Sequence, residues 1–397
     1  MMTVFEIALN VATLILLLPV CVLFAQVLLA VTRRGTEATE QGNRPRLTIV
    51  MPAHDEAALI SITVLSIMPQ LLKSDRLLVV ADNCTDQTAA LAAAAGAEVI
   101  IRTDSVHRGK GYALDYAIRH LESDPPGVVI VIDADCQVAT GALDQLARCC
   151  ARTERPVQSL NLMHAGPDAA LKMRIAEFAW LVKNFVRPIG MHRLGLPCQL
   201  MGTGMAFPWP CIRSAKLATG HIVEDLKLGI TLARAGKPPL FCPQALVTSE
   251  FPTSHEGIRE QRTRWEHGHL SVILSDAPRL FAESVASLNV NMMTLALDLS
   301  VPPLALLTLG VMSVWLTSAI FFLLTKTLLA LELTTATATL LGLAVLLSWA
   351  RYGRQLLSLG TLAFALVYPV LKIPLYLKFL VARQRHWIRS KRDSKPP

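Results

Sequence analysis

The chain has 397 residues, of which 52% are apolar and only 17% are charged, with a net charge of +8. A typical soluble domain is about 45–50% apolar and about 25% charged, and the mean hydropathy here is +0.44. These values exclude a disordered chain and a nucleic-acid-binding tail protein, and they argue against a simple soluble enzyme. A membrane protein, or a soluble domain joined to membrane segments, remains.

The N-terminal stretch 7–31 is almost entirely apolar and carries no charge. It is long enough to cross a bilayer, and it lacks the basic start and the shorter core of a cleaved signal peptide. Arg33 and Arg34 follow it, which favours a cytoplasmic C-terminal end for this segment. We therefore expect residues 1–34 to form an uncleaved transmembrane anchor, followed by a polar linker over 35–45.

From residue 46 onward, short apolar runs alternate with helical patterns. Strands are predicted at 46–52, 76–82, 97–102 and 127–135, and helices at 56–72, 85–96 and 111–122. The last strand is uniformly apolar, as expected for a strand that is buried on both faces. The alternation predicts an α/β fold with a parallel, doubly wound sheet. We place this cytosolic domain at residues 35–284.

The C-terminal part of the chain is apolar again. The stretches 301–324 and 328–350 can each span a bilayer, whereas 356–381 fits either a tilted span or a shorter helix along the membrane surface. The number of spans, two or three, and the side of the C-terminus therefore stay open. The final residues combine six basic side chains with one acidic one, which suits contact with anionic lipid headgroups and equally a solvated tail. The corresponding regions are a membrane region at 285–382 and a basic tail at 383–397.

The segment 171–190 combines apolar and basic groups at helical spacing. This pattern is typical of an amphipathic helix at the membrane interface, and also of an ordinary helix packed on the sheet. We favour the interface, because it would bring the active site to the membrane.

Acidic side chains follow three of the predicted strands. Glu56 comes after the first strand, Asp82 ends the second, and Asp133 and Asp135 end the fourth. One such residue is often only a helix N-cap, but ligands of open α/β sheets bind at this edge. So many carboxylates repel one another unless a cation is present, and oxygen ligands suit Mg²⁺ or Mn²⁺. The pattern predicts a metal–diphosphate site, while the absence of P-loop and G-x-G-x-x-G motifs disfavours nucleotide hydrolysis and NAD binding.

These residues belong to an ordered series of motifs. The series is MPAHDE (51–56), ADNCTD (81–86), HRGKGYAL (107–114), DAD (133–135), GTGMAF (202–207), VED (223–225) and QRTRW (261–265). With it, the block 46–270 resembles the family 2 inverting glycosyltransferases, in the arrangement of membrane-integrated cellulose, hyaluronan and chitin-oligosaccharide synthases. The resemblance implies a GT-A-like doubly wound domain in the cytosol, flanked by transmembrane α-helices, in the inner or plasma membrane of a bacterium.

The resemblance also implies a donor site. Asp82 would contact the base of the nucleotide sugar, Asp133 would lie near the ribose and diphosphate, and Asp135 would ligate the metal. Glu56 and Lys110 fall in nucleotide-contacting motifs. The implied cofactor is Mg²⁺ or Mn²⁺, which would neutralise the charge developing on the leaving diphosphate.

On the acceptor side, the resemblance implies that Asp225 is the general base, with Glu224 beside it. Proton removal by such a group is typically worth about 10²–10⁴-fold in rate. Gln261, Arg264 and Trp265 match the motif that holds the diphosphate and the acceptor sugar, and an arginine can bind phosphate oxygens in a bidentate manner. The residue before Glu224 is valine, where the common motif has threonine; both carboxylates of the motif are retained.

The sequence thus predicts a membrane-bound inverting glycosyltransferase. It would use a nucleotide sugar, with a UDP-sugar as the leading donor, to form a β-linked exopolysaccharide or oligosaccharide. The stretch 197–209 is expected to line the acceptor's access route. Expected partners are the donor, a glycan or lipid-linked acceptor, membrane lipids, and export partners or further copies of the chain, but not nucleic acid. One alternative is a non-processive transferase that adds a single sugar to a lipid or lipid-linked acceptor. Another is a non-catalytic membrane partner of a polysaccharide synthase or export complex.

Overall fold

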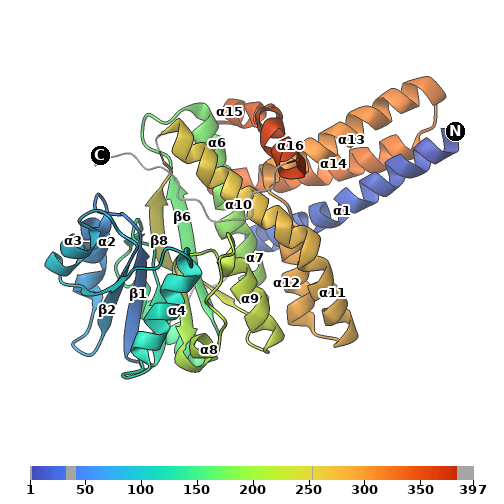
Figure 1. Cartoon of the computed structure of the whole chain (residues 1–397). Helices are drawn as coiled ribbons and strands as arrows, with labels where there is room; N and C mark the ends of the chain where they lie inside the picture. The colour runs from blue at the N-terminus through green and yellow to red at the C-terminus, as the bar shows by residue number, and fades with distance from the viewer. Residues whose placement is uncertain (1, 33–41, 253, 382–397) are drawn as a thin grey trace.

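The computed structural model describes residues 2–32, 42–252 and 254–381. It has two parts, an α/β domain built on one sheet and a bundle of three long helices that projects away from it (Figure 1). The bundle consists of α1 (Met2–Thr32), α13 (Leu304–Thr325) and α14 (Leu329–Ser348). Most of the predicted linker and the whole basic tail at 383–397 lie outside the described residues.

The sheet has eight strands in the order β3-β2-β1-β4-β7-β6-β8-β5. The strands are β1 (Leu47–Ala53), β2 (Arg76–Asp82), β3 (Glu98–Arg102), β4 (Val128–Val131), β5 (Gln137–Val138), β6 (Val157–His164), β7 (Met205–Pro208) and β8 (Leu240–Glu250). The four strands that the sequence predicts, β1 to β4, are parallel. However, β7 is antiparallel to both β4 and β6, and β5 is antiparallel to β8. In this half of the sheet, β6 and β8 are parallel to each other. The sheet is therefore mixed, and the prediction of a parallel sheet is wrong for β7 and β5.

Two glycines with positive φ angles come just before β7. Gly202 and Gly204 have φ angles of 89° and 65°, in the region that favours glycine. A Cβ at Gly204 would lie 1.7 Å from the Ser159 Oγ on β6, so only glycine fits beside that strand. Because four of the residues from 197–209 form this central strand, only the preceding segment is left to line a cavity.

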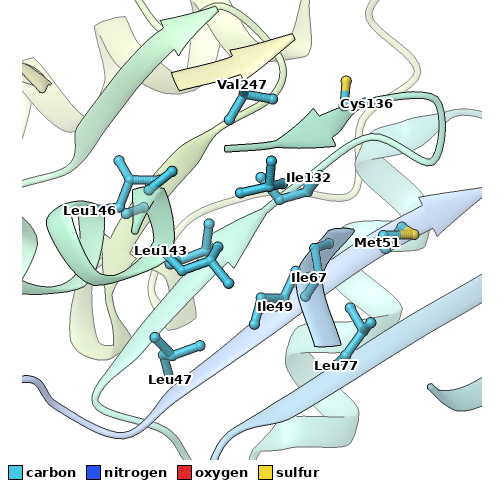
Figure 2. Packing of buried hydrophobic residues seen from close by; sticks show 14 of the residues in the cluster. Leu47, Ile49, Met51, Ile67, Leu77, Ile132, Cys136, Leu143, Leu146 and Val247 are labelled. Atoms are coloured by element: carbon cyan, nitrogen blue, oxygen red, sulfur yellow. The ribbon is translucent and has the colours of Figure 1, made fainter. Parts of the chain in front are cut away.

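Helices cover both faces of the sheet. On one face, alternate β1 residues such as Ile49 and Met51 pack with α2 (Ile60–Ile67) and α5 (Ala142–Thr153), as Figure 2 shows in part. On the other face, Val50 packs with α4 (Lys110–Leu121) and α9 (Glu224–Arg234) in a second cluster. This alternation follows from the period of two in a strand, and it makes the domain doubly wound. The remaining helices of the domain are η1 (Met68–Gln70), α3 (Thr88–Ala94) and α8 (Trp209–Arg213).

The segment 171–190 is helical, as predicted, and lies between the sheet domain and the bundle. It forms α6 (Leu171–Leu181), the π-helical turn η2 (Val182–Val186) and α7 (Arg187–His192). Its apolar side chains pack in one cluster with residues of α1, α13 and α14. A Cβ at Gly190 would lie 2.1 Å from the Gln26 carbonyl oxygen, so α7 and α1 are in close contact. Its position at a membrane interface stays a prediction.

Three helices in the described residues are long and apolar enough to cross a membrane: Val4–Thr32, Leu304–Thr325 and Leu329–Gly353, the last including the turn η3 (Trp349–Gly353). The ambiguous stretch 356–381 is broken into short helices. They are α15 (Leu359–Phe364), η4 (Tyr368–Lys372) and α16 (Ile373–Val381). Because α13 leads away from the domain and α14 returns, these short helices lie at the domain end of the bundle (Figure 1).

Three further helices connect the sheet domain to the bundle: α10 (His255–Ser275), α11 (Ala277–Ala286) and α12 (Val290–Ser300). Asp298 on α12 accepts hydrogen bonds from Arg187 on α7 and from Gln26 on α1, at 2.8 and 2.7 Å. These side chains are buried. A buried ion pair is stable when further hydrogen bonds satisfy the remaining polar atoms of both charged groups. This network therefore links the bundle to the domain.

Candidate active site

All ten residues that the sequence predicts for the site line one pocket of about 260 Å³. The pocket lies at the carboxyl ends of β1, β2 and β4, where open α/β sheets bind ligands. It is closed on the other side by α6, α9 and α10. The ten residues are Glu56, Asp82, Lys110, Asp133, Asp135, Glu224, Asp225, Gln261, Arg264 and Trp265.

At the β2 end of the pocket, Asp82 forms a buried ion pair with Arg102. The guanidinium at the end of β3 donates to Asp82 Oδ1 at 2.6 Å, and also to the His107 carbonyl at 2.8 Å. Burial raises the pKa of the Asp82 carboxyl, although the Arg102 guanidinium opposes the shift. Asp82 is therefore held in one place by its neighbour, so it forms a fixed wall of the pocket.

At the centre of the pocket, Lys110 bridges two segments of the chain. Its ammonium group donates to an Asp133 carboxylate oxygen and to the Gly202 carbonyl, the latter at 2.6 Å. Burial would lower the pKa of Lys110, but Asp133 and Glu224 outweigh it and the pKa is raised. Lys110 thus stays charged and fixes the glycine turn against the β4 end.

Glu224 and Asp225 begin α9 on the opposite wall. The Leu226 backbone N–H donates to Asp225 Oδ1 at 2.8 Å. Burial and the adjacent Asp225 raise the pKa of Glu224 to about 7, and burial likewise raises the pKa of Asp225. In the described part of the chain, neither carboxylate belongs to an ion pair within 4.0 Å. This wall of the pocket therefore carries carboxyl groups that bind protons more readily than usual.

The third wall comes from α10. Gln261 and Trp265 are four residues apart, about one helical turn. Arg264 lies between them in sequence, and all three side chains line the pocket. The Trp265 ring packs against the Trp180 ring of α6, with centroids 4.9 Å apart and an interplanar angle of 40°. The tryptophan thus has both a packing partner and a face toward the cavity.

Another cluster of side chains that could bind a metal lies outside the pocket lining. Asp55, Cys84 and Asp86 lie close enough together to hold a metal ion. However, Asp55 Oδ1 accepts the Thr85 N–H at 2.6 Å, and Asp86 Oδ2 accepts the Ala57 N–H at 3.1 Å. These carboxylates brace the loops after β1 and β2, so we assign them a structural role.

Sequence reasoning missed other residues in and beside the pocket. Arg102 pairs with the pocket residue Asp82 but is not itself part of the pocket lining. It ends a predicted strand, so the search for polar residues at strand ends could have found it. Thr203, whose Oγ1 accepts the Asp133 N–H at 3.0 Å, lies in a quoted motif without a predicted role. Trp180 and Lys183 line the pocket from α6 and η2, and no local pattern indicates this.

Comparisons with known proteins point to the same chemistry. The profile of the family "Glycosyltransferase like family 2" matches residues 45–268. The probable glycosyltransferase YdaM of Bacillus subtilis (strain 168) is 24% identical over 254 residues, which cover 60% of this chain and 58% of that protein. The chain thus spans just over half the length of this relative.

A solved structure covers nearly the whole chain. The mannosyltransferase PcManGT from Pyrobaculum calidifontis, in complex with GDP-Man and Mn²⁺, superposes with a TM-score of 0.59 at 16% identity, covering 97% of this chain and 100% of that one. This likeness shows a GT-A-like fold.

A second solved structure is less similar. It is the glucosyl-3-phosphoglycerate synthase from Mycobacterium tuberculosis in complex with Mn²⁺, UDP and phosphoglyceric acid, with a TM-score of 0.36 at 21% identity over 59% of this chain and 84% of that one. That score is too low for an inference about this chain. The family profile, in contrast, covers more than half of the 397 residues, and with the curated relative it supports a glycosyltransferase enzyme. The chain belongs to the glycosyltransferase family 2-like proteins.

Proposed function

We propose that this protein is an integral-membrane glycosyltransferase that uses a nucleotide sugar and a divalent cation, Mg²⁺ or Mn²⁺. The observation that carries the proposal is one pocket in which Asp133, Asp135, Glu224 and Asp225 converge, with Lys110 bonded to the first of them. The mannosyltransferase with a similar fold holds GDP-Man and Mn²⁺, which supports this class of donor. We keep a UDP-sugar as the leading donor and test GDP-sugars beside it.

The donor set fits a hard cation. Asp135 would hold it, with Asp133 nearby, and the excess of carboxylates over ammonium groups in the pocket favours a bound positive charge. When bound, the cation would neutralise the charge that develops on the leaving diphosphate. Glu56 and Asp82 would contact the nucleotide at the β1 and β2 ends. Arg264 would bind phosphate oxygens through its planar guanidinium, together with Gln261.

Asp225 would act as the general base. The acceptor hydroxyl would attack the anomeric carbon from the face opposite the diphosphate, so the anomeric centre inverts. The hydroxyl proton would pass to the Asp225 carboxylate, because burial raises the pKa of this group and so favours proton acceptance. Trp265 offers an aromatic face to an acceptor sugar, and Glu224 completes this wall.

The leading product is a β-linked exopolysaccharide or oligosaccharide, because the motif series resembles that of polysaccharide synthases. A second candidate, the addition of one sugar to a lipid or lipid-linked acceptor, is favoured by a specific observation. An apolar pocket of about 470 Å³ adjoins the catalytic one and shares four lining residues with it. A non-catalytic partner of a synthase is disfavoured, because the motif carboxylates are all present.

We further propose that the protein resides in the inner or plasma membrane of a bacterium. The three long apolar helices would form the membrane part. The catalytic domain would then lie in the cytoplasm, where nucleotide sugars are made, with export partners or further copies of the chain at the membrane.

A donor screen tests the proposal. Purified full-length protein is incubated with a panel of UDP- and GDP-sugars, Mn²⁺ and bacterial lipid, and release of the nucleoside diphosphate is measured. We expect release with one or a few donors, its loss on chelation, and its loss in Asp135→Ala but not in Asp115→Ala, which changes a carboxylate on α4 away from the pocket. Equal release with and without chelator would contradict the metal-dependent mechanism.

A further inference from the structure

A second large pocket lies between the α/β domain and the helix bundle. It has a volume of about 470 Å³ and is lined by α6, α10, α13, α14 and α15. Its walls are mostly apolar, with side chains such as Phe178, Val311, Leu341 and Leu362, all of which are buried. A pocket of this size and lining suits the hydrocarbon part of a ligand.

This apolar pocket joins the catalytic pocket. Trp180, Lys183, Trp265 and His269 line both. A ligand that fills the apolar pocket therefore reaches the catalytic one at the Trp180–Trp265 ring pair. A chain in the first pocket would place its headgroup next to the acceptor wall of the second.

Two cationic groups of the apolar pocket, one of them at the junction, lack a carboxylate partner among the described residues. Lys183 and Arg262 both line the apolar pocket, and within residues 42–252 and 254–381 neither forms an ion pair. Arg262 contacts the Met173 sulfur at 3.1 Å, and Lys183 lies over the Trp180 ring, 5.6 Å from its centroid. Both cations thus remain available to an anionic ligand.

The other cations of this pocket are already paired, since Arg187 bonds Asp298 and Lys372 bonds Glu266. At the junction, His269 is only 3% exposed, and its Nε2 has no hydrogen-bond partner among the described residues. A buried polar atom without a partner is costly, so a polar group of a ligand fits here.

The mouth of the apolar pocket points to a membrane. Met312, Leu346, Leu359 and Leu366 line the pocket and are also exposed at the surface. They lie on α13, on α14 and near α15, at the domain end of the helices long enough to span a bilayer. Exposed apolar side chains at this level let a lipid enter sideways from the bilayer.

We propose that the apolar pocket holds the hydrocarbon chains of the sugar acceptor, an anionic membrane phospholipid whose headgroup carries a free hydroxyl. This inference rests on the proposed function in its second form, the addition of one sugar to a lipid acceptor. Lys183 and Arg262 bind the lipid phosphate, and the headgroup hydroxyl reaches Asp225. A bond forms between the hydroxyl oxygen and the anomeric carbon, and the bond from that carbon to the diphosphate breaks. The proton passes to Asp225, and the nucleoside diphosphate leaves.

Gly342 on α14 allows the pocket to be filled without disturbing the fold. It lines the pocket, and a Cβ added there meets no atom within 4 Å, so the side chain of Gly342→Phe starts in open space. Gly360→Phe is the matched control, because Gly360 is exposed on α15 and lies outside the pocket lining. Both variants add the same apolar side chain to the membrane part of the chain.

The first experiment is photo-cross-linking in phosphatidylcholine vesicles that contain phosphatidylglycerol with a diazirine in its acyl chain. We expect cross-links to α13 and α14 in the wild type and in Gly360→Phe. In Gly342→Phe the yield should fall about tenfold or more, the effect of displacing roughly two buried methylenes. Lys183→Met should reduce the preference for phosphatidylglycerol over an equivalent phosphatidylcholine probe, and Lys183→Arg should restore it. Equal yields in the two glycine variants would overturn the inference.

The second experiment follows labelled sugar with a donor identified by nucleoside diphosphate release. Label should enter lipid with phosphatidylglycerol, and not with phosphatidic acid, which lacks the hydroxyl, or with diacylglycerol, which lacks the phosphate. Label found in a water-soluble glycan whatever the lipid would refute the lipid acceptor. Mn²⁺-dependent binding of nucleoside diphosphate distinguishes failure of the lipid inference from failure of the proposed function. If the wild type and Gly342→Phe both bind the nucleotide but no lipid is labelled, the result counts against the lipid inference alone. If the wild type does not bind the nucleotide, the result counts against the proposed function.

Discussion

The carboxylates on the two walls of the catalytic pocket differ in their ion-pair partners. On the sheet side, Asp82 and Asp133 are paired with Arg102 and Lys110. On the helix side, Glu224 and Asp225 sit at the start of α9 without an ion pair among the described residues, and the pKa of each is raised. An ion-pair partner fixes a carboxylate and opposes the rise in pKa that burial causes, as Arg102 does at Asp82, whereas an unpaired, enclosed carboxylate binds a proton more readily. We therefore propose a positioning role for the sheet side and a proton-transfer role for the helix side.

The largest expected effect comes from the helix side. Asp225→Asn removes the proton acceptor and keeps the shape of the side chain, so we predict that transfer falls by about 10²–10⁴-fold. The rate of nucleoside diphosphate release measures this, with Mn²⁺-dependent nucleotide binding as evidence of an intact donor site. Asp115→Asn, on the surface of α4, is the matched control and should be neutral. A near wild-type rate in Asp225→Asn would contradict a proton-transfer role for the helix side of the pocket.

On the sheet side, we predict a loss of stability. Arg102→Ala leaves the Asp82 carboxylate buried and unpaired, which typically costs about 3–5 kcal/mol. Arg119→Ala breaks an exposed pair with Asp115, and such pairs are worth about 0–1 kcal/mol. Thermal unfolding in detergent should show a much larger fall in Tm for Arg102→Ala. Similar falls in both variants would mean that the Asp82–Arg102 pair does not support the wall.

The smallest effect is a shift in pH dependence. A base whose pKa is raised is protonated at a higher pH, so activity should be lost as the pH falls through the raised pKa of Asp225. Because Glu224 and Asp225 interact, Glu224→Gln removes a neighbouring negative charge and lowers the pKa of Asp225. We predict that the acid limb of the pH–rate profile moves down by about one unit. An unchanged limb would show that the two carboxyl groups are not coupled.

The sequence predicted the first half of the sheet well, for a physical reason. Each of β1 to β3 is followed by a helix, and β2 and β4 end at or near acidic side chains. Periodicity alone therefore locates both this part of the sheet and Asp82, Asp133 and Asp135. In contrast, β7 has only four residues, and Gly202 and Gly204, with positive φ angles, come just before it. No apolar pattern encodes the direction of β7, so the prediction of parallel strands was applied to too much of the sheet.

The helix side of the site could be predicted only through the motif resemblance. Asp225, Gln261 and Trp265 are far from the strand ends in sequence, and tertiary packing of α9 and α10 brings them to the pocket. Trp180 and Lys183 escaped prediction altogether, because their segment was interpreted by its amphipathic pattern alone. The apolar pocket requires α6, α10 and the bundle to be placed together, which no local sequence pattern describes.

The most direct test of the account is nucleotide binding by calorimetry on the purified full-length protein. UDP and GDP are titrated with Mn²⁺ and with chelator, in the wild type and in Asp135→Ala. We predict binding of one nucleotide in the wild type only when Mn²⁺ is present. In Asp135→Ala, binding should weaken by more than the roughly 10–100-fold typical of residues that only support a metal ligand. Binding that is the same with chelator, and the same in Asp135→Ala, would contradict a metal–diphosphate site in this pocket.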